Sequence, residues 1–317
     1  MKANRIYFLV VCLLVSSSLA VAQESFDDKL EKALGLLKKQ TEMAAAAVKG
    51  EKIYRGACLP CHGVNGDGKG PYYEALNPKP RNFTTGKFKF RTTSSRSVPT
   101  DQDLFKTISK GLPGTFMPAW EDLLSEKDRM ALVQYIKTFS KRFAVSGDLI
   151  ERNDVSNQVP YSRDSILKGR KVYKEMECIK CHGDGGRGDG PSAGDLKDDW
   201  GYRIRPADLR KSWNFRGGNS RQDIYHRFTG GISGTPMPSI VESFVLDEEI
   251  DEIKIKIEDE EELTAEEQKK YDEAMAEIRK KVWHLTNYVR ALSRRPGFFY
   301  RLFVEDTEVT KQRSGEK

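Results

Sequence analysis

The chain has 317 residues, of which 38% are hydrophobic and 32% charged, and its formal net charge is +6. This length corresponds to about two domains of ordinary size. The composition is that of a soluble protein and only the N-terminus is strongly apolar, so a protein built from several membrane-spanning helices is excluded.

Residues 1–22 have the pattern of a secretory signal peptide. Lys2 and Arg5 precede an apolar run over residues 6–15, and small residues follow, ending in Ala20-Val21-Ala22. This pattern predicts cleavage after Ala22. The alternative is an uncleaved membrane anchor, but the run is well short of the roughly 20 residues that a spanning helix needs. We therefore expect an exported chain whose mature form lacks a transmembrane anchor.

Residues 23–48 are expected to form an amphipathic helix. Phe26, Leu30, Leu34 and Leu37 recur at the spacing that puts apolar side chains on one stripe of a helix. This N-terminal helix leads into the first of two cysteine motifs.

The two motifs are Cys58-Leu59-Pro60-Cys61-His62 and Cys178-Ile179-Lys180-Cys181-His182. The fifth cysteine, Cys12, leaves with the predicted signal peptide. Disulfides do not explain a His after each pair, and a zinc site needs four ligands close in space, whereas the pairs lie 120 residues apart. A thioredoxin-type motif explains C-x-x-C once and gives the His no role. C-x-x-C-H is the attachment signal of covalent haem, so the sequence predicts two haem c groups.

The motifs belong to a tandem repeat. Residues 49–54 match residues 168–173, and Gly114-Thr115-Phe116-Met117-Pro118 matches Gly234-Thr235-Pro236-Met237-Pro238. Met117 follows His62 by 55 residues, and Met237 follows His182 by 55 residues. The repeat predicts two domains, residues 49–143 and 165–295, joined by a polar linker at residues 144–164. Each domain is expected to begin and end with a helix.

Met117 and Met237 are the candidate sixth ligands of the two irons. His62 and His182 supply one axial ligand each, and the other must come from the opposite face of the ring. Each Met stands in extended or turned chain before a Pro. The alternative is a core methionine, which gives no reason for the equal spacing.

His226 and His284 have no partner in the first repeat, and position 284 corresponds roughly to Ala131. We expect both to be surface or satisfied core histidines.

Two segments lie outside the repeat. Met117 to Tyr135 is 18 residues and Met237 to Tyr288 is 51, so the second domain carries a charged insert of about 33 residues, which we place within residues 242–280. Its 248–262 stretch is acidic, and 265–281 predicts a helix. Residues 296–317 form a C-terminal tail that begins with an aromatic cluster.

On these motifs the repeats resemble class I cytochromes c, and the chain resembles the tandem dihaem members of that class. The resemblance covers about residues 49–142 and 165–295. It implies an all-α fold of two tandem domains in which the first and last helices of each domain cross, here with an N-terminal helix and a charged helical insert added. It also implies that Pro71 and Pro191 orient the ligand histidines through their carbonyls, with a plain turn proline as the alternative.

Ligation by His and Met fills both axial positions and raises the potential, which suits electron transfer and leaves no open site for a substrate. We therefore expect no catalytic residue. The chain is expected to be a periplasmic dihaem cytochrome, either a carrier or the cytochrome subunit of a respiratory oxidoreductase complex. The alternative is a dihaem cytochrome c peroxidase, which needs a releasable position on one haem and nearby acid or base groups.

Charge is distributed unevenly along the chain. Residues 49–142 hold 17 Lys and Arg against 9 Asp and Glu, whereas the insert is acidic. Basic surface near a haem favours acidic redox partners. The insert is expected to dock on a complex or against the basic face of the first domain, and a nucleic acid partner is not expected.

Overall fold

The structure, a computed structural model, describes residues 2–146, 150 and 152–293, with the side chains of residues 28 onward. The predicted aromatic tail therefore lies outside the described residues, and cleavage after Ala22 stays a prediction. The described chain is helical, with two isolated β-bridges in its loops. The predicted all-α fold of two tandem halves is confirmed. Within the described part of the chain, no helix is both long and apolar enough to cross a membrane.

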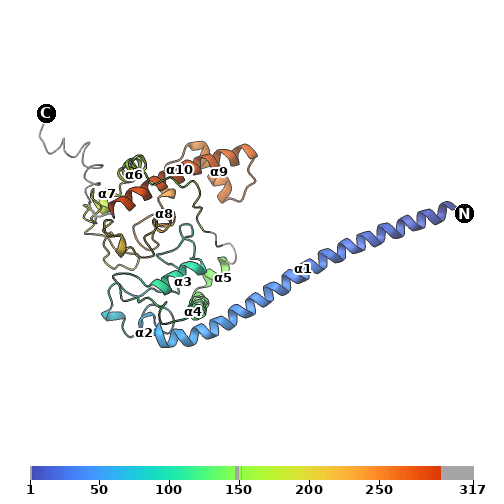
Figure 1. The fold of residues 1–317 in the computed structure, drawn as a ribbon, viewed down its shortest axis with the longest axis horizontal. Helices are drawn as coiled ribbons and strands as arrows, with labels where there is room; N and C mark the ends of the chain where they lie inside the picture. The colour runs from blue at the N-terminus through green and yellow to red at the C-terminus, as the bar shows by residue number, and fades with distance from the viewer. Residues whose placement is uncertain (1, 147–149, 151, 294–317) are drawn as a thin grey trace.

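The first half contains one long helix, a short helix that carries the first cysteine motif, and three further α-helices. These are α1 (Lys2–Ala57), α2 (Leu59–His62), α3 (Asp101–Lys110), α4 (Glu126–Thr138) and α5 (Lys141–Ser146), with the 3-10 turn η1 (Tyr73–Ala75) between α2 and α3. The N-terminal part of α1 projects away from the rest of the molecule (Figure 1). Its predicted apolar stripe is open to solvent, with Leu30, Leu34 and Leu37 all exposed.

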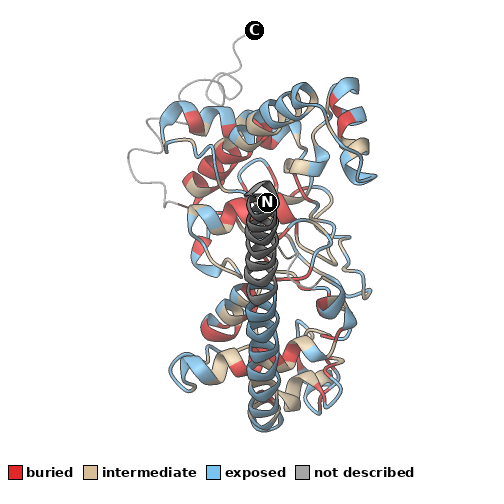
Figure 2. Cartoon of the chain, turned by 90° about the vertical axis from the view of Figure 1, so that its right-hand side faces the viewer, coloured by how far each residue is buried: buried red, intermediate tan, exposed pale blue. Residues whose placement is uncertain are grey.

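The second half repeats this order and adds the insert. Its helices are α6 (Arg163–Glu175), α7 (Ile179–His182), α8 (Arg221–Gly230), α9 (Glu248–Glu258) and α10 (Ala265–Leu292), with the 3-10 turns η2 (Ser212–Asn214) and η3 (Val241–Ser243). Each half has its own buried cluster, which Figure 2 shows as separate red regions.

The first and last helices of each half cross at a glycine, as the resemblance implies. A Cβ atom on Gly50 of α1 would lie 2.1 Å from the carbonyl oxygen of Ala131 in α4. A Cβ atom on Gly169 of α6 would lie 2.0 Å from the carbonyl oxygen of His284 in α10. Only glycine permits this approach. The two crossings also confirm that position 284 corresponds to Ala131.

Helices α3 and α8 begin with the same capping box. The hydroxyl of Thr100 accepts from the amide of Asp103, whose carboxylate accepts from the Thr100 amide, and Ser220 and Asp223 repeat the arrangement. These reciprocal bonds satisfy amide groups that a helix start leaves unpaired. Both helices therefore begin at a fixed residue, and a methionine loop follows each of them in the chain.

The charged insert folds onto the second half. Ile250 and Ile253 of α9 are buried, and Lys256 and Lys270 pair with Glu267 and Glu249 at 2.6 and 2.7 Å. Arg279 reaches Asp154 of the linker at 3.4 Å. Figure 1 shows α9 at the end of the molecule remote from α2 and α4. The insert therefore does not dock against the basic face of the first domain, which was one of the two places expected for it.

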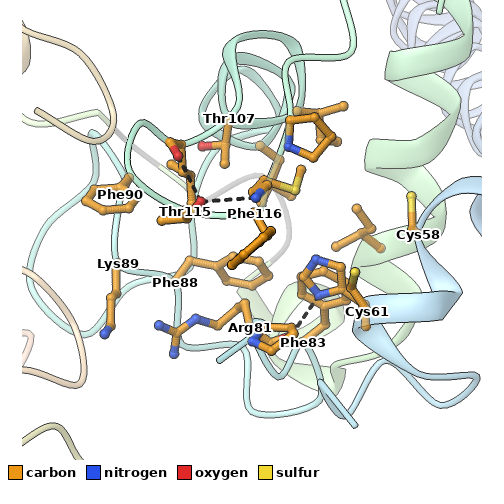
Figure 3. Close-up of a pocket in the computed structure, with 18 of the residues that line it drawn as sticks. Cys58, Cys61, Arg81, Phe83, Phe88, Lys89, Phe90, Thr107, Thr115 and Phe116 are labelled. Atoms are coloured by element: carbon orange, nitrogen blue, oxygen red, sulfur yellow. Dashed lines mark hydrogen bonds between the residues drawn. The ribbon is translucent and has the colours of Figure 1, made fainter. Parts of the chain in front are cut away.

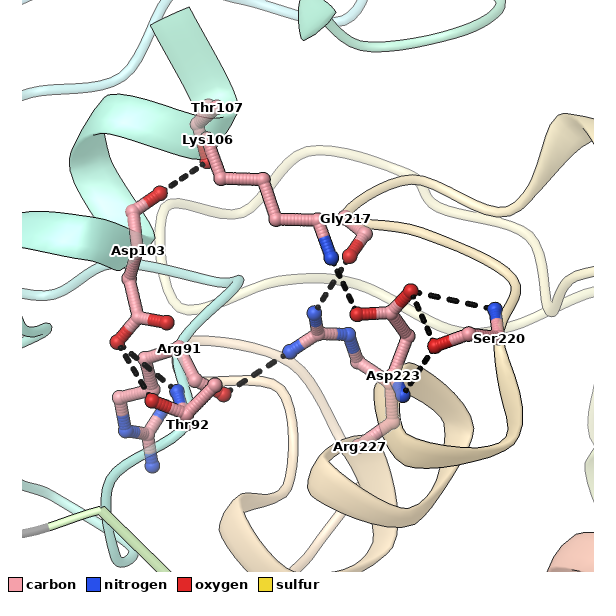
Figure 4. A network of polar contacts seen from close by, with 9 residues as sticks. All are labelled: Arg91, Thr92, Asp103, Lys106, Thr107, Gly217, Ser220, Asp223 and Arg227. Carbon is pink, nitrogen blue, oxygen red and sulfur yellow. Dashed lines mark hydrogen bonds and ion pairs between the residues drawn. The ribbon is translucent and has the colours of Figure 1, made fainter. Parts of the chain in front are cut away.

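The two halves meet through α3, α8 and the loops beside them. Arg91 is almost fully buried and donates to the carbonyl of Gly230 at 2.5 Å and to the hydroxyl of Ser233 at 2.6 Å. Arg227 of α8 donates back to the Arg91 carbonyl at 3.1 Å, and Lys106 pairs with Asp223 (Figure 4). Part of the first domain's positive charge is thus used in binding the second domain.

Candidate haem sites

Each cysteine motif folds as one short helical turn. The amides of His62 and His182 donate to the carbonyls of Cys58 and Cys178 at 2.9 and 2.8 Å. The turns end at Gly63 and Gly183, whose φ angles are 78° and 74°. A single turn places both thiols and the imidazole along one edge of a site, which the attachment of one haem requires.

The histidine rings are held by carbonyl groups from distant loops. His62 Nδ1 lies 3.0 Å from the carbonyl oxygen of Arg81, and His182 Nδ1 lies 3.0 Å from that of Ala207. A bond at Nδ1 leaves Nε2 as the nitrogen for the iron and fixes the plane of the ring. The prediction that Pro71 and Pro191 supply these carbonyls is wrong.

The glycine-rich loop explains this correction. The amides of Gly68 and Gly70 donate to the carbonyls of His62 and Cys61 at 2.9 and 3.1 Å, so the loop turns back onto α2. Gly70, the residue before Pro71, therefore packs on the backbone of Pro60 and not on the imidazole. The Phe83 amide donates to the Gly66 carbonyl at 2.7 Å, which brings the chain around Arg81 to the ring.

Aromatic side chains support the first cysteine motif. Phe83 stacks on His62 with ring centroids 4.4 Å apart, and the Tyr54 hydroxyl donates to the Gly63 carbonyl at 2.7 Å. In the second half Tyr173 donates to Gly183 at the same distance, 2.7 Å. Burial lowers the pKa of His62 to about 4, so the ring is neutral, as a metal ligand must be.

The methionine loops have the same hydrogen bonds in both halves. The Thr115 hydroxyl donates to the Leu112 carbonyl at 2.8 Å and accepts from the Met117 amide at 3.1 Å. Thr235 makes the corresponding bonds to Ile232 and Met237 at 2.8 and 3.3 Å. The repeated Gly-Thr therefore serves to fix the methionine, a role that the sequence comparison did not assign to the threonine.

A glycine lets each loop close. Gly111 and Gly231 have φ angles of 62° and 63°, and a Cβ atom on either would lie within about 3 Å of the carbonyl oxygen of Met117 or Met237. The amides of Leu112 and Ile232, one residue later, donate to these carbonyls at 3.1 Å in both halves. Both loops thus return the chain to the end of the preceding helix.

The structure brings Met117 into the same pocket as Cys58, Cys61 and His62. Apolar side chains form most of its wall, including Leu76, Phe83, Phe88, Leu104, Ile108, Phe116, Trp120, Leu132 and Ile136. Figure 3 shows Cys58 and Cys61 on one side of the pocket and Thr115 and Phe116, which directly precede Met117, on the other. An apolar slot with thiols and imidazole at one end and a thioether on the opposite wall fits a haem c.

At the second site, Met237 and the motif residues Cys178 and Ile179 pack against one buried cluster of the second half. This cluster also contains Tyr173 and Tyr288, which are the counterparts of Tyr54 and Tyr135 in the first half. Met237 and the second cysteine motif therefore border the same apolar cluster of the second half.

The cysteines do not have the properties of a redox-active dithiol. Cys58, Cys61, Cys178 and Cys181 are all free of disulfides. Burial raises the pKa of the Cys58 thiol to about 12 and that of Cys178 to about 11, whereas an attacking cysteine has a lowered pKa. Among the described residues, no group of three His, Cys, Asp or Glu side chains is arranged to hold a metal ion.

The two remaining histidines have other partners. His284 Nδ1 lies 2.8 Å from the Ser165 hydroxyl, between α6 and α10. His226 is only 2% exposed and stands in the core of the second half, next to Tyr225. His284 is half-buried and hydrogen-bonded, as expected, whereas His226 is buried but not satisfied, because its Nδ1 has no hydrogen-bond partner within the described structure.

Comparison with known families supports the two-domain arrangement. Residues 45–136 match the family described as cytochrome c oxidase, cbb3-type, subunit III, and residues 166–254 match the family described as cytochrome c. No curated protein matches the chain significantly.

A solved structure extends the similarity over most of the chain. It is a chain of the reducing HAO-like protein complex of Kuenenia stuttgartiensis, with 38% sequence identity and a TM-score of 0.63. The match covers 78% of this chain and 96% of the other.

Two crossed-helix halves, each with a C-x-x-C-H turn, define a dihaem c-type electron-transfer protein. The chain belongs to the cytochrome c family, as a tandem of two cytochrome c domains that carry two covalently bound haem c groups.

Proposed function

We propose that this chain is an exported dihaem cytochrome that serves as the electron-transfer subunit of an oxidoreductase complex, with His62 and Met117 on one iron and His182 and Met237 on the other. The paired methionine loops carry this proposal. Two loops with the same glycine, the same threonine bonds and the same spacing from the ligand histidine have a common purpose. Two saturated irons change oxidation state with little rearrangement, which favours electron transfer over catalysis.

Two observations favour a subunit over a free carrier. The similar solved chain belongs to a multi-protein complex. The chain also has features that a small shuttle does not need, namely the projecting helix α1 with its exposed leucines and the α9–α10 insert, whose outer face is highly charged.

Ligation is tested on the holoprotein with both haems attached. We expect low-spin spectra and the far-red absorption band of an iron–methionine bond from both haems. Met117→Leu and Met237→Leu should each remove about half of this band and lower one potential. A variant that leaves the band intact shows that its methionine is not a ligand. A resting high-spin haem with hydrogen peroxide turnover would favour a dihaem peroxidase instead.

Export and assembly need separate measurements. N-terminal sequencing of the mature protein should begin at Gln23. Purification of the tagged full-length chain from its native host at low ionic strength should retain a larger redox complex, and recovery of the chain alone under these conditions would favour a free carrier.

A further inference from the structure

The first haem pocket has a cluster of positive charge at the end opposite its cysteines. Arg81, Lys89 and Arg216 all line this pocket. Figure 3 shows Arg81 and Lys89 on the side away from Cys58 and Cys61. In a haem c, the thioether links and the two propionate carboxylates are on opposite edges of the ring. The cluster therefore stands where the negative charge of a haem held by Cys58 and Cys61 is found.

Arg216 belongs to the other domain. It precedes α8 in the second half, yet its Nε donates to the Pro113 carbonyl at 3.1 Å and its Nη2 to the Gly114 carbonyl at 3.2 Å. Pro113 and Gly114 are part of the loop that carries Met117. Within the described chain the third nitrogen of this guanidinium, Nη1, makes no hydrogen bond or ion pair, which leaves it able to bind an anion.

Second-domain residues also hold Arg81 and Lys89. The Arg81 guanidinium lies over the Trp200 ring at 4.3 Å, and the Lys89 ammonium lies 3.4 Å from the Asp198 carboxylate. No carboxylate of the described residues is within ion-pair distance of Arg81. The carboxylates of Asp198 and Asp199 attract the half-buried Arg81 guanidinium only from beyond ion-pair distance, so its burial is costly until an anion binds it directly. Arginine matches a carboxylate through two parallel N–H bonds.

From this placement we propose that the second domain completes the first haem site: Arg216, together with Arg81 and Lys89, binds the propionates of the haem attached at Cys58 and Cys61. The positive charge stabilises the reduced, less positive iron and raises its potential. At the second site Ala207 takes the place of Arg81 as the residue whose carbonyl meets the histidine, so this guanidinium has no counterpart at that position. The inference rests on the bound haem and on no particular redox partner.

The test uses the full-length holoprotein and a spectroscopic redox titration. Arg216→Gln should lower one of the two midpoint potentials by the equivalent of about a tenfold change in the reduction equilibrium, about 59 mV for one electron. It should also shift a haem propionate bending mode in the resonance Raman spectrum. Arg216→Lys should keep most of the potential. Lys269→Gln, which removes an exposed positive charge of α10 outside this pocket and away from both cysteine motifs, is the control with the same change of charge.

Unchanged potentials and an unchanged propionate mode in Arg216→Gln would overturn the proposal. So would an equal shift in Lys269→Gln, or a shift of both haems without a change in the propionate mode, because either result means a general effect of charge or packing. If Arg216→Gln fails to load haem, Lys89→Gln replaces it, with the same expected lowering of one potential and the same contrary outcomes.

Discussion

At the scale of single residues, Thr115 is a small group with a large effect on the first iron site. Its hydroxyl both donates to Leu112 and accepts from Met117. Thr115→Val keeps the shape and removes both bonds, so we expect the free energy of unfolding to fall by about 1–2 kcal/mol. Because the loop loosens, the iron–methionine band should also disappear at a lower temperature, as a thermal titration of this band would show.

Thr138 provides the control for this prediction. Its hydroxyl donates to the Tyr135 carbonyl at 2.7 Å, a bond of the same type at the exposed end of α4. Thr138→Val should leave the band in place at all temperatures below unfolding. An identical melting of the band in both variants would mean that Thr115 acts only on overall stability.

His226 makes the stability of the protein depend on pH. The pKa of His226 is lowered from 6.5 to about 4, chiefly by burial and then by Arg152 and Arg227, while Asp103 and Asp223 oppose the shift. Between pH 4 and pH 6.5 the His226 imidazole is therefore protonated in the unfolded chain and neutral in the folded chain. The contribution of His226 is therefore fully present above pH 6.5 and is lost as the pH falls toward 4.

We expect His226 to account for a loss of up to about 3 kcal/mol in the free energy of unfolding between pH 7 and pH 4. Denaturant unfolding of the wild-type holoprotein and of His226→Gln over this range measures the effect. The variant should have the shallower pH dependence, and parallel curves for the two proteins would contradict the assignment.

At the scale of helices, the two crossings depend on glycine. Gly50→Ala or Gly169→Ala places a methyl group against the carbonyl of Ala131 or His284, and we expect a loss of about 2–3 kcal/mol as the helices move apart. Gly35→Ala in the exposed part of α1, where a Cβ atom meets nothing within 4 Å, should be neutral or stabilising by up to about 1 kcal/mol. Thermal unfolding of the three holoproteins gives the comparison, and equal effects at Gly35 and Gly50 would contradict it.

The sequence predicted the crossing helices well because the two repeats share the residues that form them. The match of residues 49–54 to 168–173 located both crossings, and the equal spacing of Met117 and Met237 located both loops. The carbonyl acceptors of the histidines were missed, because they lie 19 and 25 residues beyond His62 and His182, across loops of unequal length. A shared signal did exist, since Pro80 and Pro206 directly precede the two acceptor residues.

At the scale of the whole molecule, the arrangement of the two domains could not be predicted from either repeat. Arg91 is one of 17 basic residues of the first domain, and nothing in its local sequence distinguishes it from an exposed arginine. Only the fold shows that it is 1% exposed and bonded to the other domain. This interface also makes the two haem sites unequal, because it brings Arg216 and Trp200 of the second domain to the first site.

Arg91 therefore decides whether the two domains unfold together. Arg91→Met leaves the Gly230 carbonyl and the Ser233 hydroxyl without their buried donor, and we expect a loss of about 2–4 kcal/mol. Scanning calorimetry of the holoprotein should then show two transitions in place of one, because the coupling between the domains is weakened. Lys106→Met removes a partly exposed ion pair of the same interface and should cost less than about 1 kcal/mol while keeping one transition. A single, unshifted transition in Arg91→Met would mean that other interface contacts, such as the pairing of Lys87 with Asp199 at 3.0 Å, couple the domains without it.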